Sequence, residues 1–347
     1  MKNNRQSNFE LLRIFAILSV VAGHFIRQSV LMQSPVAGND IVNTFLGSGA
    51  RIAVNIFLLI GSWFMVDAAF NPKKALKLYL QVAYYCIPVT LIMAFTGHAG
   101  GIRNIAQGLL PFFGRPVWFA TAYISLMLLA PFLNMAFRLP EKKQAQLAGT
   151  LFFLFCIVST VPSFTPLDYI ADLSWFCVVY VMTGWVKKND ILSVFNVNKY
   201  LLLAFSVFSY SALCVLSRMP AFGFAANYWL DNIKTLPNFA CALSLFLFFA
   251  KCDIGTRPFV NFWARSVFAV YIVHQIPAFR EFEWSCLCHA EKIAWLPAPL
   301  YALSIAAVAV AVLATVTLAD SVRIKLFDFA ARKTGKRSSN DNSVRQR

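Results

Sequence analysis

The first hydrophobic segment, FELLRIFAILSVVAGHFIRQ at residues 9–28, decides the fold class of this chain. A transmembrane helix needs about 20 consecutive, mainly apolar residues, and this segment has that length while still carrying charged side chains. The composition agrees: of 347 residues, 59% are hydrophobic and only 13% are charged. Barrel strands would show alternating segments of about ten residues, which this sequence lacks. The sequence therefore predicts an all-α, polytopic membrane protein.

Working outward from this segment, we find ten stretches that are long and apolar enough to span a bilayer. They cover approximately residues 9–29, 43–66, 75–96, 117–137, 145–163, 171–187, 199–217, 233–250, 264–280 and 298–319. No soluble domain fits between them. We expect a cytoplasmic amino terminus at 1–8, a ten-helix membrane domain at 9–320, and a basic, partly disordered cytoplasmic tail at 321–347.

The distribution of basic residues sets the predicted orientation. The net charge of +16 could suggest nucleic-acid binding, but in a membrane protein a basic cytoplasmic face explains it better. When the ten spans alternate from a cytoplasmic amino terminus, 22 of the 31 Lys and Arg residues fall on the cytoplasmic side, 7 fall on the other side and two lie within spans. This bias predicts that both termini are cytoplasmic and that nucleic acid is not a partner.

Arg13 and His24 are the most informative polar residues, because charged groups inside a span are costly and usually functional. They are eleven residues apart, which places them within about 20° of the same helix face and about 16 Å apart along the axis. Glu10 and Arg27 lie near the same stripe. Alone, Arg13 could extend to the headgroups and His24 could bond to another helix. Together they indicate a polar track with an imidazole suited to general base catalysis.

Other polar residues fall on later spans. Arg51 and Asn55 are four apart and share a face of the second span. Lys74 and Lys77 begin the third span, where they either anchor the topology or contact the phosphates of a cytoplasmic donor.

Aromatic and histidine side chains add candidates for an acceptor pocket. Trp118 and Tyr123 lie at the outer edge of the fourth span, as aromatic belt residues do, although sugar rings also stack on such side chains. His274 lies deep in the ninth span. The eight cysteines show no metal-ligand spacing, so we expect no bound metal. The sequence also contains no phosphate loop and no GxSxG elbow.

These segments, in this order, resemble the acyltransferase-3 family of integral-membrane O-acyltransferases. Arg13 and His24 fit a basic-x10-His signature, AVNIFLLIGSWFM at 53–65 is similar to the family's second span, and Lys74-x-x-Lys77 lies where many members carry Arg-x-x-Arg. VWFATAYISLMLLAPFLN at 117–134 and FVNFWARSVFAVYIVHQIP at 259–277 resemble the fourth- and ninth-span signatures. The resemblance covers about residues 5–320.

The resemblance implies transfer of an acyl group, usually acetyl from cytoplasmic acetyl-CoA, to a carbohydrate hydroxyl at the bacterial inner membrane. Acetyl-CoA would be a co-substrate, with no bound cofactor, and the acceptor would be a cell-envelope glycan or a lipid-linked sugar. His24 would be catalytic, with Arg13 and Glu10 supporting it. Lys74 and Lys77 would hold the donor, and Arg51, Asn55, Trp118, Tyr123 and His274 would line the acceptor pocket.

Some features depart from the family pattern, and alternatives stay open. Lys74 and Lys77 replace the usual arginines, and lysine cannot bind a phosphate in the bidentate way that arginine does. Ile60 stands where members often have Ser. His24 could act as a base or as a covalent acetyl carrier. Ten helices with internal charges also suit a transporter or flippase, although we find no inverted repeat between the two halves.

Overall fold

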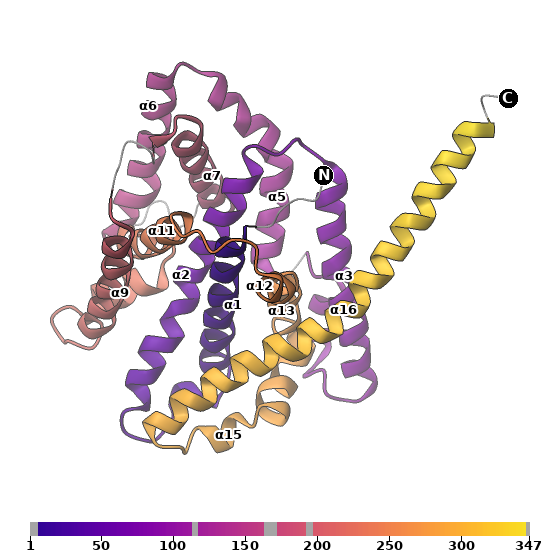
Figure 1. Ribbon diagram of the computed structural model, residues 1–347. Coiled ribbons are helices and arrows are strands. Elements are labelled where there is room, and N and C mark those ends of the chain that lie inside the picture. Colours follow the sequence, from indigo (N-terminus) through magenta and orange to yellow (C-terminus); the bar gives the residue numbers. More distant parts are fainter. Residues whose placement is uncertain (1–5, 113–116, 163–171, 192–196, 345–347) are drawn as a thin grey trace.

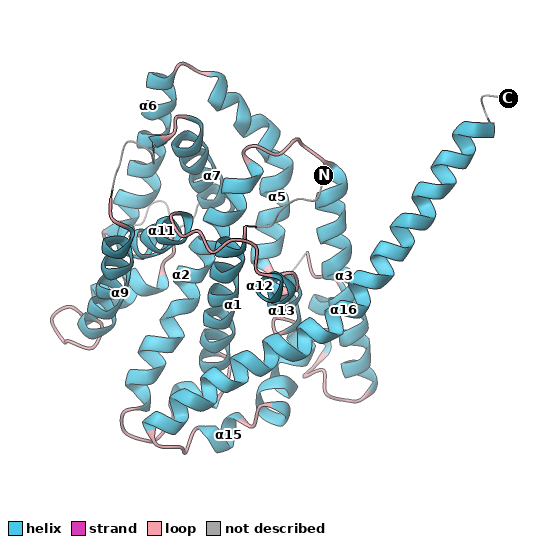
Figure 2. Ribbon diagram, in the orientation of Figure 1, coloured by secondary structure: helices cyan, strands magenta, loops and turns pink. Residues whose placement is uncertain are grey.

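The computed structural model describes residues 6–112, 117–162, 172–191 and 197–344, and the regular elements in these ranges are all helices (Figures 1 and 2). The longer helices are α1 (Ser7–Arg27), α2 (Asn39–Met65), α3 (Pro72–Phe95), α5 (Trp118–Leu133), α9 (Lys199–Leu216) and α16 (Ala298–Val344). The shorter ones are α4 (Ile102–Leu109), α6 (Glu141–Phe152), α7 (Asp172–Lys188), α10 (Gly223–Asp231), α11 (Leu236–Ala250), α12 (Pro258–Ala264), α13 (Val267–Val273), α14 (Pro277–Glu281) and α15 (Ala290–Ile293). Single turns of 3-10 or π-helix add Val30–Gln33, Asn134–Arg138, Phe153–Ile157, Val158–Thr160 and Phe282–Leu287.

Within the described residues, six helices are long and apolar enough to cross a membrane, and a seventh span results if α10 and α11, bent by 50°, are counted as one. The chain is therefore a helical membrane protein. The other predicted spans fall on shorter helical stretches, namely α6 with the turns that follow it, α7, and α12 to α14. Residues 1–5, 163, 171 and 345–347, which belong to the predicted amino terminus, span ends and tail, lie outside the described residues.

The predicted span 264–280 is not one continuous helix. α13 ends at Val273, and α14 begins at Pro277 as its first residue. Proline lacks a backbone N–H and disfavours helical geometry in the residue before it, so the break before Pro277 follows from the sequence. The break leaves His274 at the carboxyl end of α13.

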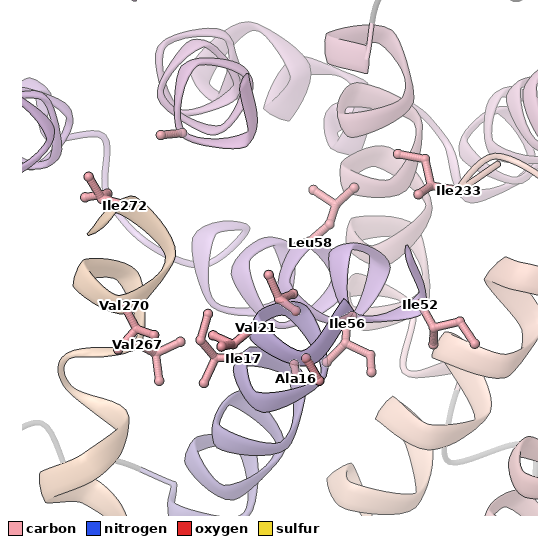
Figure 3. Packing of buried hydrophobic residues seen from close by; sticks show 14 of the residues in the cluster. Ala16, Ile17, Val21, Ile52, Ile56, Leu58, Ile233, Val267, Val270 and Ile272 are labelled. Carbon is pink, nitrogen blue, oxygen red and sulfur yellow. The ribbon is translucent and has the colours of Figure 1, made fainter. Parts of the chain in front are cut away.

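Helix α1 lies at the centre of the fold and contacts α2, α11, α12, α13 and α16. Figure 3 shows apolar side chains of α1, α2 and α13 in the same part of the core, among them Ala16, Ile17, Ile56, Val267 and Val270. The polar side chains described below must therefore lie on the part of α1 that this packing leaves uncovered.

A small-residue contact brings α1 and α2 close together. A Cβ atom added at Gly23 would lie 2.6 Å from the Ala50 Cβ and 2.8 Å from the Gly47 carbonyl oxygen. Small residues at membrane helix interfaces permit this approach of two backbones. Because the two helices are antiparallel neighbours, Arg51 lies level with the His24 end of α1. Beyond the core, α16 continues as one helix to Val344 and extends away from the other helices (Figure 1).

We predict that Gly23→Ala lowers the stability of the folded protein, because the new methyl group must push α1 and α2 apart. Overpacking of this kind costs about 1–3 kcal/mol. Thermal unfolding in detergent measures the change. Gly149→Ala, in α6 with no neighbouring atom within 4 Å of its added Cβ, is the matched control and should not lower the midpoint. Equal midpoints for the two variants would contradict the close approach of α1 and α2.

Candidate active site

A cavity of about 650 Å³ follows the uncovered side of α1. Glu10 and Arg13 line one end of it, and His24, Arg27 and Gln28 line the other. The polar stripe predicted from helical spacing therefore faces a single cavity, rather than lipid or the apolar core.

A second cavity of about 200 Å³ adjoins the first, and both are lined by Arg13, Gly61 and Tyr123. Its lining also includes Lys74, at the start of α3. A Cβ atom added at Gly61 would lie 2.7 Å from the Tyr123 ring and from its hydroxyl, so Gly61 leaves only enough room for the ring. The two adjoining cavities thus extend from Lys74, past Arg13, to His24.

His24 is held by a side chain on its own helix. Gln28 Nε2 lies 2.6 Å from His24 Nδ1, and Trp284 Nε1 donates to Gln28 Oε1 at 3.4 Å. With the amide nitrogen facing the ring, neutral His24 accepts at Nδ1 and carries its proton on Nε2. A half-turn of the Gln28 amide would let Nδ1–H donate to the amide oxygen and leave the Nε2 lone pair free, as a base or nucleophile requires, in exchange for the Trp284 hydrogen bond to Gln28 Oε1. Gln28 therefore selects the tautomer of His24.

A second imidazole lies beside the first. The His24 and His274 ring centroids are 5.2 Å apart. His274 Nδ1 lies 2.6 Å from the Val270 carbonyl oxygen, and since a carbonyl can only accept, the neutral ring carries its proton on Nδ1. The Nε2 atom of His274 is buried and has no hydrogen-bond partner among the described residues. His274 does not line either cavity, and it lies beside the His24 ring on the side away from them.

The positive charge of Arg13 is neutralised inside the fold. It forms an ion pair with Glu10 at 2.7 Å, where Glu10 is 7% exposed and Arg13 is 28% exposed. The guanidinium also faces the Phe64 ring at 5.9 Å. Arg13 lines both cavities and its partner Glu10 lines the large one, unlike an arginine that only extends to the headgroups. The second Glu10 oxygen, Oε2, has no hydrogen-bond partner among the described residues.

Of the remaining predicted site residues, some line a cavity and others do not. Arg51, Trp118 and Tyr123 line the large cavity, and Lys74 lines the small one. Lys77 is exposed and lines neither.

Asn55 lies in a buried network away from both cavities. It donates to the Ile233 carbonyl at 2.8 Å and to Asn238 at 3.1 Å, and it accepts from the Trp175 indole at 2.9 Å. Arg51 and Asn55 share a helix face by spacing, but only Arg51 reaches the cavity.

Several lining residues were not predicted from the sequence. Gln28 could have been found, because it follows His24 by one helical turn. Gln275 and Arg280 could not, because the break before Pro277 sets their directions, and Tyr271 on α13 could not, because spacing alone does not show what a helix face meets. The buried atoms Gln275 Nε2 and Arg265 Nε have no partner among the described residues, so the cavity presents donors that a ligand could use.

Two carboxyl groups outside the spanning helices have shifted pKa values. Hydrogen bonds from Lys187 and Lys188 lower the pKa of Asp67, near the Lys74 end. Burial raises the pKa of Glu283, beside Trp284, to about 8. No cluster of three or more His, Cys, Asp or Glu side chains that could hold a metal ion occurs in the described part of the chain.

Comparison with known proteins gives one match. A family model described as an acyltransferase domain, that of the acyltransferase-3 family, matches residues 6–319. No curated protein and no solved structure matches the chain.

We predict that Asn55→Leu destabilises the protein, because the Trp175 indole and the Asn238 side chain lose a buried partner. Each polar group left unpaired costs about 1–3 kcal/mol. Thermal unfolding measures the loss, and Asn227→Leu, which removes only exposed hydrogen bonds from α10 to the Ser217 and Gly223 carbonyl oxygens, serves as the control. An Asn55→Leu protein as stable as the control would show that this network is not needed for the fold.

Proposed function

The chain belongs to the acyltransferase-3 family, and on this premise we propose that it is a membrane O-acetyltransferase that moves an acetyl group from acetyl-CoA to a glycan hydroxyl. The acceptor is a cell-envelope glycan or a lipid-linked sugar. The observation that carries this proposal is the pair of adjoining cavities, which share Arg13 and extend from Lys74 to the imidazole of His24.

The donor enters at the Lys74 end. Lys74 offers a point charge to the phosphates of acetyl-CoA, and Arg13 lies on the route between the two cavities. Gly61 and Tyr123 are in contact where the two cavities adjoin, and a thin chain such as the pantetheine arm can pass beside this contact, along Arg13. The acetyl thioester then reaches the larger cavity, where His24 lies. Acetyl-CoA acts as a co-substrate, and the reaction uses no bound cofactor.

His24 carries the chemistry. It removes the proton from the acceptor hydroxyl, whose oxygen bonds to the acetyl carbon as the carbon–sulfur bond breaks and the CoA thiolate leaves. Alternatively, His24 takes the acetyl group first and passes it to the hydroxyl in a second step. Both routes need the Nε2 lone pair, and therefore the Gln28 orientation that accepts a bond from Nδ1–H.

The orientation in the membrane follows from the charge distribution. We propose ten spans, with both termini and the Lys74 end in the cytoplasm of a bacterial cell, across its inner membrane. The His24 end of α1 then faces the outer side, where envelope glycans are assembled.

We predict that His24→Ala abolishes acetyl transfer by the purified protein. General acid–base catalysis contributes about 10²–10⁴-fold, so the rate should fall by at least a hundredfold. The measurement is release of free CoA and transfer of labelled acetyl from acetyl-CoA. His289→Asn is the control, because His289 is exposed and Asn tolerates its left-handed backbone. Unchanged transfer in the His24 variant would remove His24 from the mechanism, and substrate counterflow without acylation would favour a transporter.

We predict that Gly61→Leu obstructs the boundary between the two cavities by displacing the Tyr123 ring. The leucine side chain takes space that the Tyr123 ring now fills. The ring, which lines both cavities, must then move into them, so kcat/KM for acetyl-CoA should fall at least tenfold while binding of the acceptor persists. Adding Tyr123→Ala to Gly61→Leu restores space and should recover part of the activity. Full activity of the single variant would show that the donor does not pass this point.

A further inference from the structure

Three arginines line the large cavity around its His24 end. They come from three helices: Arg27 from α1, Arg51 from α2 and Arg280 from α14. The Gly23–Ala50 contact places Arg51 level with His24. The charges of all three arginines act on the His24 ring, so they lie around the same space.

These positive charges are only partly compensated. Arg27 forms an ion pair with Asp231 at 2.6 Å. Arg51 and Arg280 form no hydrogen bond or ion pair with another residue in the described ranges, and Asp172 and Asp231 act on Arg51 only from a distance. The acidic residue that lines the cavity, Glu10, is at the other end and is bonded to Arg13. The His24 end therefore keeps two guanidinium groups without a partner.

A second observation points to a ligand at the same cavity. Gln275 is 6% exposed and lines the cavity, yet its Nε2 donor has no partner. A buried donor without a partner is costly, and a bound acceptor of hydrogen bonds would satisfy it. Two free guanidinium groups and a free amide donor form a set that suits an anion, because guanidinium groups bond carboxylate and phosphate oxygens in pairs.

Resting on the proposed function, we propose that Arg51 and Arg280 bind an anionic group of the acceptor, a carboxylate or a phosphate. The donor does not account for them. Arg13 and Arg27 are separated by 14 residues of α1, or about 21 Å, and the donor phosphates remain at the Lys74 and Arg13 end when the thioester reaches His24. The arginines at the His24 end thus select acidic glycans or diphosphate-linked sugars over neutral ones.

The test measures equilibrium binding to the protein in nanodiscs, without donor. The probes are a hexuronic acid tetrasaccharide, its carboxyl-reduced neutral form, a polyprenyl diphosphate sugar, and acetyl-CoA. We expect at least one of the two charged acceptors to bind at least tenfold more tightly than the neutral sugar. Arg51→Gln with Arg280→Gln should remove that preference, and the corresponding double lysine variant should keep most of it. Binding of the tetrasaccharide alone would assign the site to sugar carboxylates, and binding of the lipid alone to the diphosphate.

Arg103→Gln with Arg138→Gln is the charge-matched control, because both arginines are exposed and line neither cavity. The proposal is overturned if neither charged acceptor binds more tightly than the neutral sugar, or if the glutamine double variant keeps the preference. It is also overturned if that variant loses affinity for acetyl-CoA instead. His24-dependent acetylation of the neutral sugar, with no charge preference, would refute the anion site and leave the acyltransferase intact. Absence of any His24-dependent consumption of acetyl-CoA would refute the proposed function itself.

Discussion

Charged side chains on a membrane helix have to be paired or given access to a polar space, and α1 carries Glu10, Arg13 and Arg27 together with His24. The fold meets this requirement in two ways. Glu10 neutralises Arg13 and Asp231 neutralises Arg27 by direct ion pairs. The same side of α1 is then left uncovered, so that these groups line a cavity instead of contacting lipid. The arrangement of the helices around α1 thus follows from the need to pair or expose these charged groups.

Two local features of the sequence make that cavity. Gly23 and Gly47 bring α1 and α2 together, which carries Arg51 to the level of His24. Pro277 stops α13 and redirects the chain, which turns His274 toward His24 and brings Gln275 and Arg280 to the cavity. The site therefore draws on segments more than 200 residues apart in the chain, all arranged against one helix.

The part of the site that sequence reasoning could predict is the part that lies on one helix. Regular helical spacing relates Glu10, Arg13 and His24, and the structure finds them on one cavity. Spacing could not predict that Arg51 lines the cavity while Asn55 joins a buried hydrogen-bond network, because a shared helix face does not show which neighbour each side chain contacts. It also could not locate Arg280 or Gln275, whose positions depend on the break before Pro277. The helical membrane class could be predicted from composition. The number of spanning helices could not: in the described ranges six helices meet the length and apolarity criteria, because several of the ten predicted spans fall on short or broken helices.

The central claim is that the donor reaches His24 from the Lys74 end, through the passage beside Arg13. The most direct measurement is an electron cryo-microscopy structure of the protein in nanodiscs with a non-reactive thioether analogue of acetyl-CoA. We predict that the phosphates lie by Lys74, the pantetheine arm passes beside the Gly61–Tyr123 contact, and the acyl carbonyl lies next to the His24 ring. An analogue bound at the opposite end of α1, or with its acyl group away from His24, would contradict this path.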